Sequence, residues 1–193
     1  MTTYITSASR LFAIMLLLSF LTGQAYAEEG KYVRTVQNYT IPDVILVNQN
    51  GTKVRLRDQL KSNKPVIVEF IFATCTTICP VLSASFANLQ QKLGKDSQKV
   101  HLISITIDPE NDTPKVMKEY LRRYRAKPGW DFLTGSRADI DAVMNAFNAY
   151  VSNKMYHIPL TLMRAAGDDH WIRIYGLLNS TEFVNEYKKV GLK

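Results

Sequence analysis

Both cysteines of this 193-residue chain stand where a buried strand gives way to a helix, and this junction constrains the fold more than any other feature. The apolar run at residues 66–72 predicts a buried strand. Cys75 and Cys79 follow in the segment Cys75-Thr76-Thr77-Ile78-Cys79-Pro80. Apolar residues spaced i, i+4, i+7 and i+11 then predict an amphipathic helix, namely Leu82, Phe86, Leu89 and Leu93. The thiols are therefore expected near a helix N-terminus.

A helix N-terminus favours negative charge, because its first N–H groups are free and the helix dipole is positive there. The thiolate is the form of cysteine that binds soft metals and attacks disulfides. If the helix begins at Ile78 or earlier, the four-residue spacing of Cys75 and Cys79 turns both sulfurs to one side. Pro80 stands where a first-turn proline is tolerated.

Three interpretations of the cysteine pair compete. A structural disulfide is the simplest, but a CxxxC bridge closes a very short loop and adds little chain-entropy stabilisation. A redox dithiol and a soft-metal site are the other two. Both require exposed thiols of low pKa, so the motif alone does not separate them.

The N-terminus has the pattern of an export signal. Arg10 precedes an apolar core at 11–21, and Ala25-Tyr26-Ala27 is a small-x-small cleavage site. The apolar core is about half the ~20 residues that a membrane helix requires. We therefore expect residues 1–27 to be a signal peptide cleaved after Ala27, with an uncleaved membrane anchor as the alternative.

Residues 28–193 are the length of one domain with a sizeable core. Export predicts a periplasmic protein, or one at the outer face of the inner membrane. Thiols are oxidised in such compartments, so a dithiol working there needs a thiol reductase as a partner.

The chain is basic, with 24 Lys and Arg, 17 Asp and Glu and a formal net charge of +7. The basic residues are scattered, and the densest cluster, at 122–127, closes a predicted helix, where cations suit the dipole. A solvated basic face explains this pattern better than nucleic-acid binding, so no nucleic-acid partner is expected. Such a face could still meet an acidic partner or lipid headgroups.

The rest of the pattern predicts alternating strands and helices, after a lead-in at 28–38 that shows no clear period. The elements expected in order are a hairpin with strands at 41–47 and 52–56 around Asn50-Gly51, a helical turn at 57–60, a strand at 100–107, a helix capped by Thr113 and running to about Arg125, a short strand or loop at 131–135, a helix capped by Ser136, strands at 157–164 and 171–175, and a helix capped by 180–182. This order predicts an α/β fold with a mixed central sheet flanked by helices.

Three segments in this order resemble the Sco (synthesis of cytochrome c oxidase)/SenC family, a branch of the thioredoxin-like fold. They are Phe70-Ile71-Phe72-Ala73-Thr74-Cys75-Thr76-Thr77-Ile78-Cys79-Pro80, Ile105-Thr106-Ile107-Asp108-Pro109-Glu110-Asn111-Asp112-Thr113-Pro114 and Trp130-Asp131-Phe132-Leu133-Thr134-Gly135. A histidine, His157, opens the penultimate strand. The resemblance covers roughly residues 39–190 and implies a thioredoxin-like domain with an N-terminal β-hairpin.

The resemblance implies a copper site built from Cys75, Cys79 and His157, with Asp108 close by as a weak ligand or a neighbour of the ligands. Soft thiolates suit Cu(I), and imidazole suits either oxidation state. Family members deliver copper to the dinuclear centre of cytochrome c oxidase, or keep its cysteines reduced. The implied function is therefore that of an exported copper metallochaperone. The implied partner is the copper-site subunit of the oxidase or another copper or thiol protein.

Two alternatives to the copper carrier stay open, so whether the chain is an enzyme is undecided. A thiol-disulfide reductase would attack with Cys75 and resolve the mixed disulfide with Cys79. A copper-dependent redox sensor would bind copper and transfer none. The context of His157 adds weight to thiol chemistry: the family mostly has Ser or Thr after this histidine, whereas here Ile158-Pro159 resembles the cis-proline loop of thioredoxins.

Four other residues have both a simple and a functional interpretation. Glu69, six residues before Cys75, is expected on an exposed strand face, and the alternative is a buried acid that acts as a base near a thiol. Asp108 before Pro109 fits turn chemistry as well as a site at the sheet edge. His101 is expected to pack in the core or at a strand edge, and His170 to face solvent beside the 168–169 turn.

Overall fold

The computed structural model describes residues 32–191, which lie in one compact unit spanning Lys31–Lys193. The predicted export signal and its cleavage site lie outside the described residues. Between residues 32 and 191 none of the helices combines the length and the apolarity needed to cross a membrane.

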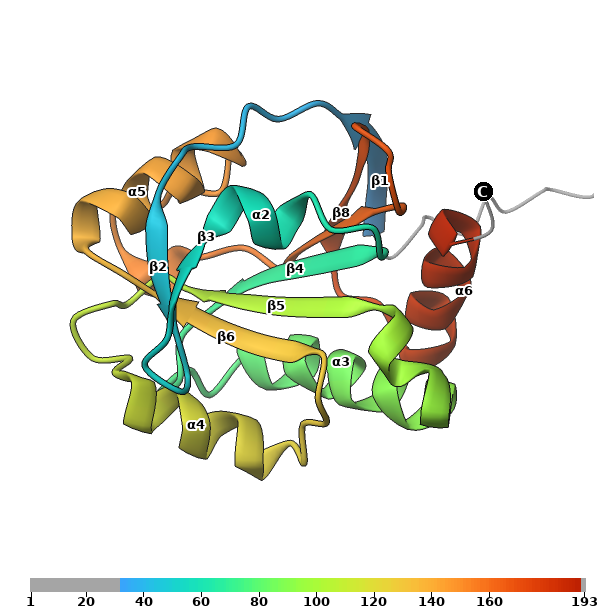
Figure 1. Cartoon of the computed structure of the whole chain (residues 1–193), viewed down its shortest axis with the longest axis horizontal. Coiled ribbons are helices and arrows are strands. Elements are labelled where there is room, and N and C mark those ends of the chain that lie inside the picture. The colour runs from blue at the N-terminus through green and yellow to red at the C-terminus, as the bar shows by residue number, and fades with distance from the viewer. Residues whose placement is uncertain (1–31, 192–193) are drawn as a thin grey trace, which may run out of the picture. The chain divides into compact units, whose positions relative to one another are not determined.

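The sequence of elements alternates strands and helices around one sheet (Figure 1). In chain order they are β1 (Tyr32–Gln37), β2 (Ile45–Asn48), β3 (Lys53–Arg55), α2 (Leu56–Leu60), β4 (Val66–Ile71), α3 (Cys79–Leu93), the 3₁₀ helix η1 (Gly94–Lys99), β5 (His101–Thr106), α4 (Pro114–Arg123), β6 (Trp130–Thr134), α5 (Arg137–Ala146), the 3₁₀ turn η2 (Lys154–Tyr156), β7 (Leu160–Arg164), β8 (Trp171–Gly176) and α6 (Ser180–Gly191).

The eight strands form a single mixed sheet in the order β1-β8-β7-β4-β5-β6-β2-β3. Strands β4, β5 and β6 are parallel, whereas β7, β8, β1 and β2 each pair antiparallel with their neighbours. Figure 1 shows α3 and α4 on one side of the sheet and α2 and α5 on the other. The predicted mixed sheet flanked by helices is confirmed, as is the hairpin, which is β2 and β3 paired antiparallel.

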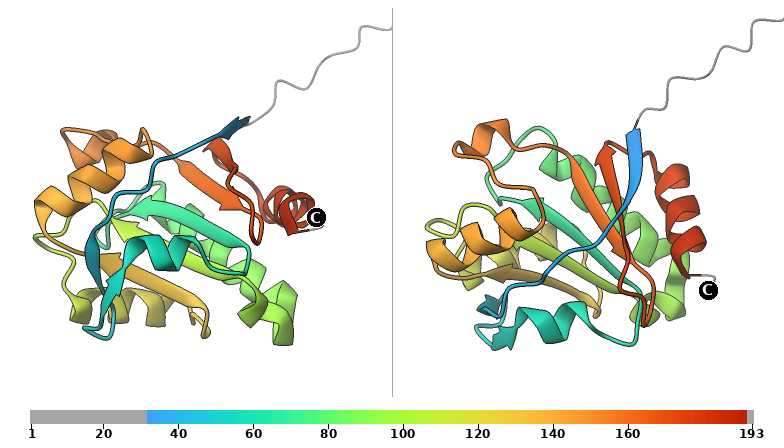
Figure 2. Two further views of the ribbon diagram at one scale, coloured as in Figure 1. Left: turned by 45° about the horizontal axis from the view of Figure 1, so that its top comes forward. Right: turned by 90° about the horizontal axis from the view of Figure 1, so that it is seen from above.

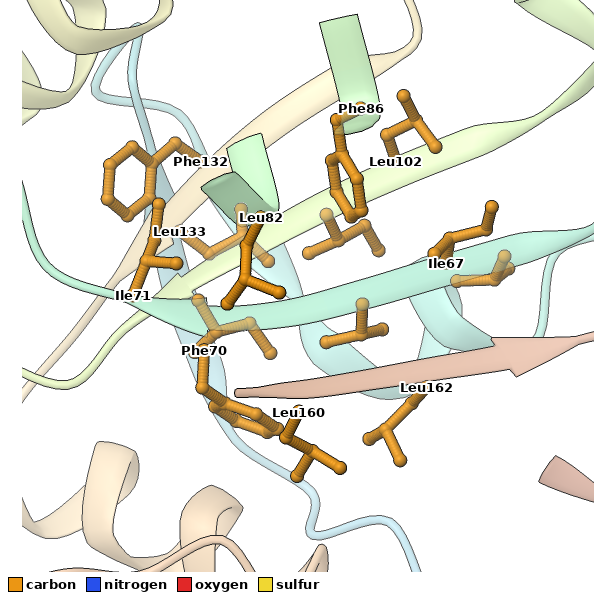
Figure 3. Close-up of a cluster of buried hydrophobic side chains, with 14 of the residues drawn as sticks. Ile67, Phe70, Ile71, Leu82, Phe86, Leu102, Phe132, Leu133, Leu160 and Leu162 are labelled. Atoms are coloured by element: carbon orange, nitrogen blue, oxygen red, sulfur yellow. The ribbon is translucent and has the colours of Figure 1, made fainter. Parts of the chain in front are cut away.

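The central strand β4 is buried along its whole length, because it has neighbouring strands on both sides and side chains packed on both faces. Figure 3 shows Leu82 and Phe86 of α3 against one face of this region. Phe70 of β4 and Leu160 of β7 lie together on the other side of the strand. The run of residues 66–71, apolar except for Glu69, therefore has the expected cause, burial on two faces.

Two helix caps agree with the sequence and a third differs. The side chains of Thr113 and Ser136 accept hydrogen bonds from backbone N–H groups in the first turns of α4 and α5, as expected. The cap of α6 is Asn179 rather than residues 180–182. Its Oδ1 accepts from the amides of Thr181 and Glu182, and the Glu182 carboxylate accepts from the Asn179 amide, which is a capping box.

The lead-in predicted without a period contains an edge strand. Strand β1 pairs with β8 alone, and most of its side chains are exposed, so no hydrophobic alternation marks it in the sequence. Its register places Tyr32 opposite Gly176, and Tyr175 in turn lies opposite Leu160. The start of β1 thus lies at the end of the sheet where β8 finishes and β7 begins, as the right-hand view of Figure 2 shows.

Glu69 is fully buried in β4, so the exposed strand face preferred for it is wrong. Its Oε1 accepts from the hydroxyls of Ser104, at 2.6 Å, and Ser83, at 3.0 Å. The Ser83 hydroxyl lies 2.9 Å from that of Tyr120, and Trp130 Nε1 donates to Ser104. Within the described residues Oε2 has no hydrogen-bond partner. Burial is the largest influence and raises the pKa of Glu69 to about 8, although the two hydroxyls oppose it.

The raised pKa of Glu69 predicts a pH-dependent stability. Because the ordinary value is 4.5, unfolding releases this proton between about pH 4.5 and pH 8. Glu69 therefore contributes fully below pH 4.5, and its contribution is lost as the pH rises through 8. Replacing Glu69 with Gln, which stays neutral, should flatten this dependence.

The measurement is the free energy of unfolding of the reduced, metal-free protein at pH 5 and pH 8.5, for the wild type and Glu69→Gln. Each pKa unit is worth about 1.4 kcal/mol, so the variant should gain on the wild type by a few kcal/mol between these two pH values. A difference between the two proteins that does not change with pH would contradict the prediction.

Candidate metal centre

The cysteine segment forms a turn between the end of β4 and the start of α3. Cys79 is the first residue of α3 and Pro80 lies in its first turn, whereas Cys75 lies in the preceding loop. The Cys75 amide donates to the carbonyl of Phe72. The helix thus begins too late for helical spacing to align the sulfurs, and the loop turn brings them together instead. Both thiols are free.

His157 approaches the cysteines from the short turn η2. Its Nε2 lies 3.1 Å from the Cys79 sulfur, and its Nδ1 lies 2.8 Å from the carbonyl oxygen of Lys154. A carbonyl can only accept, so Nδ1 carries the proton and the Nε2 lone pair of the neutral ring faces Cys79. The ring of Phe72 packs edge-on against His157 at 5.3 Å between centroids. The imidazole is therefore held with a free lone pair towards the sulfurs.

The ligand atoms of Cys75, Cys79 and His157 all lie within 4.8 Å of one another. Among residues 32–191 these three are the one group of at least three His, Cys, Asp or Glu side chains that could share a metal ion. Metal–sulfur and metal–nitrogen bonds of about 2.3 and 2.0 Å separate two ligands of one ion by on the order of 4 Å. The two sulfurs and the oriented imidazole therefore suit a soft metal with little rearrangement.

The two thiols have opposite electrostatic environments. Burial raises the pKa of Cys75, but hydrogen bonds from Cys79, from the Thr77 hydroxyl and from two backbone amides outweigh it, so the net shift is downward. The pKa of Cys79 is raised, first by burial and then by its hydrogen bond to Cys75. Cys79 is fully buried, whereas 9% of Cys75 is exposed. Cys75 is thus the more readily ionised and more accessible thiol. Burial also lowers the pKa of His157, which keeps its ring neutral.

Asp108 lies beside the donor group and not in it. Its carboxylate accepts from the Asn111 side chain and forms an ion pair with Lys154, with Nζ 2.5 Å from Oδ2. Its backbone N–H donates to Thr106 Oγ1. Asp108 thus shapes the turn after β5 and also contacts Lys154, three residues before His157.

Three residues of the site have no role assigned to them from the sequence. Asp112 is fully buried and accepts from the Ala73 amide at 3.2 Å and from the Thr106 hydroxyl at 2.5 Å, so it fixes the start of the cysteine loop. The carbonyl oxygen of Lys154 accepts from His157 Nδ1, and the ring of Phe72 packs edge-on against the imidazole. A second acid four residues after Asp108, just before a helix cap, is the signal that could have drawn attention to Asp112.

The other two histidines lie elsewhere. His101 is half-buried at the start of the central strand β5, and its Nε2 lies 2.9 Å from the Asp131 carboxylate. His170 pairs with Asp168 at 2.8 Å and is exposed. The Ile158–Pro159 peptide is trans, because residues 32–191 contain no cis peptide bond. The comparison with a cis-proline loop is therefore wrong for this bond.

Comparison with known proteins gives a consistent result. Residues 34–184, well over half of the chain, match the SCO1/SenC family model. The SCO1 protein homolog of Bacillus subtilis is 37% identical over 125 residues, which cover 63% of this chain and 64% of that protein. The SCO2-like protein of Rickettsia felis is 35% identical over 108 residues, covering 56% and 51%. The matched region thus spans less than two thirds of these relatives.

Solved structures agree with the sequence relatives. The structure of ScoI from Bradyrhizobium japonicum with copper bound has a TM-score of 0.64 at 28% identity, covering 78% of this chain and 99% of that one. BsSco, a member of the Sco family of cytochrome c oxidase assembly proteins in which a disulfide switch was identified, has a TM-score of 0.67 at 28% identity, covering 82% and 95%. These likenesses confirm the thioredoxin-like α/β fold. From the match over residues 34–184, this chain belongs to the SCO1/SenC family.

Proposed function

We propose that this protein binds copper through Cys75, Cys79 and His157 and serves the assembly of the copper centre of cytochrome c oxidase. The observation that carries the proposal is the convergence of two thiols and one oriented imidazole within 4.8 Å. Relatives of the same family support it, because ScoI of Bradyrhizobium japonicum has been solved with copper bound and BsSco is described as an oxidase assembly protein.

The donor set suits a carrier better than a storage site. Two thiolates favour Cu(I), and a neutral imidazole accommodates Cu(I) or Cu(II). Three protein ligands leave a coordination position open, through which a partner's own ligands can capture the ion. Cys75 is the partly exposed ligand, so exchange would begin on its side.

The surface around the donors supports a protein partner. Val81 in the first turn of α3, and Met155 and Tyr156 beside His157, are large apolar side chains with exposed fractions of 42%, 65% and 77%. Exposed apolar groups gathered at a site are typical of a docking surface. The proposed partner is the copper-site subunit of the oxidase, and a thiol reductase is the proposed source of electrons for the cysteines.

We also propose, from the sequence, that residues 1–27 direct export and that residues 28–193 work as a thioredoxin-like domain in the periplasm or at the outer face of the inner membrane.

The unequal ionisation of the thiols favours a second candidate function, reduction of disulfides in a partner protein. In that reaction the Cys75 thiolate attacks one sulfur of the partner's disulfide and displaces the other as a thiolate. Cys79 then attacks Cys75 and releases the reduced partner, leaving a Cys75–Cys79 disulfide.

The carrier function predicts that copper affinity depends on His157. In an anaerobic titration of the reduced 28–193 protein against a competing Cu(I) chelator, the wild type should bind one tight equivalent. His157→Ala should weaken binding by at least about 100-fold, because losing even a partner behind a ligand costs about 10–100-fold. The matched control is His170→Ala, which removes an exposed histidine remote from the cysteines.

Two results would count against this carrier function. Tight binding that survives His157→Ala would reduce the site to a bare dithiol. If the wild-type protein binds no Cu(I) tightly, the carrier function is refuted. The disulfide reductase then remains, because that reaction does not require the histidine as a metal ligand.

The pKa asymmetry of the thiols predicts their order of alkylation. At pH 7 iodoacetamide should modify Cys75 of the reduced, metal-free protein about tenfold or more faster than Cys79, because Cys75 is more ionised and more exposed. Peptide mass spectrometry at short times measures both rates. The unfolded protein is the control and should show similar rates at the two positions. Preferential modification of Cys79 in the folded protein would contradict the assignment of Cys75 as the nucleophile.

A further inference from the structure

Lys154 connects the histidine turn to the end of the central sheet. Its Nζ lies 2.5 Å from Oδ2 of Asp108, which follows β5, and 5.1 Å from the ring centroid of Phe72, which follows β4. The Asp108 side chain is 6% exposed and that of Lys154 is 35% exposed. Two neighbouring parallel strands therefore present, at their carboxyl ends, an anion and an aromatic ring to the same ammonium group.

The backbone of Lys154 also orients His157. Its carbonyl oxygen accepts from the ring Nδ1 at 2.8 Å and from the His157 backbone N–H at 3.2 Å. The position of one residue thus determines both the path of the turn and the direction of the imidazole. A shift of Lys154 would carry the Nε2 atom away from Cys79.

The turn has few other anchors. Met155 and Tyr156 are 65% and 77% exposed, so they bury little surface against the domain. The Asn153 side chain caps the turn locally by accepting from the Met155 amide, which shapes η2 without fixing it to the sheet. The contacts of Lys154 and the packing of Phe72 on His157 link residues 154–157 to the ends of β4 and β5.

We propose that Lys154 is a positioning residue, whose ion pair with the buried Asp108 fixes His157 against Cys79. The pair is a latch on the histidine loop, and it determines whether the third donor is in place before a metal arrives. An ion pair with one nearly enclosed partner couples more strongly than a fully exposed pair, because water screens it less. The consequence for copper rests on the proposed function, whereas the position of the loop does not.

The latch can be tested without metal through the reactivity of His157. Diethyl pyrocarbonate modifies accessible neutral imidazoles, and peptide mass spectrometry follows each histidine separately. Lys154→Met keeps an apolar stem over Phe72 and removes the charge. It should raise the modification rate of His157 by about tenfold, a factor within the range of couplings between contacting residues. His101 and His170 provide internal references whose rates should not change.

Matched variants assign the effect to the ion pair. Asp108→Asn should raise the His157 rate as Lys154→Met does, and the double variant should add little, because both changes remove one interaction. Lys154→Arg should restore much of the protection. Lys118→Met, the same change at an exposed lysine of α4, should have no effect. An unchanged His157 rate in Lys154→Met, or additive effects in the double variant, would overturn the proposal.

Copper binding provides an independent second measurement. Lys154→Met should weaken Cu(I) binding by about tenfold in the wild-type background and by little in the His157→Ala background, since the lysine acts through the histidine. Equal losses in both backgrounds would overturn the positioning role. Absence of tight Cu(I) binding in the wild type would instead refute the proposed function. The rates at which diethyl pyrocarbonate modifies His157 would still test whether the ion pair positions the histidine.

Discussion

Two buried carboxylates in one turn hold together the segments that carry the donor atoms. Asp112 accepts from the backbone at Ala73, where the cysteine loop begins, and from Thr106 at the end of β5. Asp108 accepts a hydrogen bond from the ammonium group of Lys154, which belongs to the histidine turn. The cost of burying these carboxylates is offset only while their partners stay in place, so the turn resists rearrangement. The distance between the cysteines and the histidine is therefore determined largely by residues that are not donors.

The same geometry supports metal binding and thiol exchange for related reasons. Both need one thiol that ionises readily and is accessible, and Cys75 has hydrogen bonds that provide this. They differ in what the second thiol and the imidazole do. Against a metal, Cys79 and His157 complete a set of three donors; in exchange, Cys79 only has to reach Cys75. The 3.1 Å contact between Cys79 and the oriented Nε2 atom serves either use, because the lone pair can bind a metal or accept the proton of Cys79.

Much of the fold was predictable, because local signals and burial agree along most of the chain. The largely apolar run of β4, the Asn50-Gly51 turn and the caps at Thr113 and Ser136 can each be recognised from a few neighbouring residues. The edge strand β1 was missed because solvent covers most of its side chains. Glu69 was placed wrongly because its partners Ser83 and Ser104 are distant in sequence, and only the fold makes a buried carboxyl acceptable there.

The residues of the candidate site also fall into those that the sequence could reveal and those that it could not. The cysteine pair and His157 could be picked out because residue type carries their chemistry. Asp112 and Lys154 could not, since an acid in a turn and a lysine in a loop are ordinary on any surface. Their roles come from contacts with Ala73 and Asp108, which are 39 and 46 positions away in the sequence.

The register of β1 determines where the described part of the chain begins relative to the donor atoms. The strand begins at Tyr32, at the end of the sheet where β8 finishes and β7 begins, and β7 starts three residues after His157. Tyr32 therefore lies at the end of the sheet that bears the cysteine loop and the histidine turn.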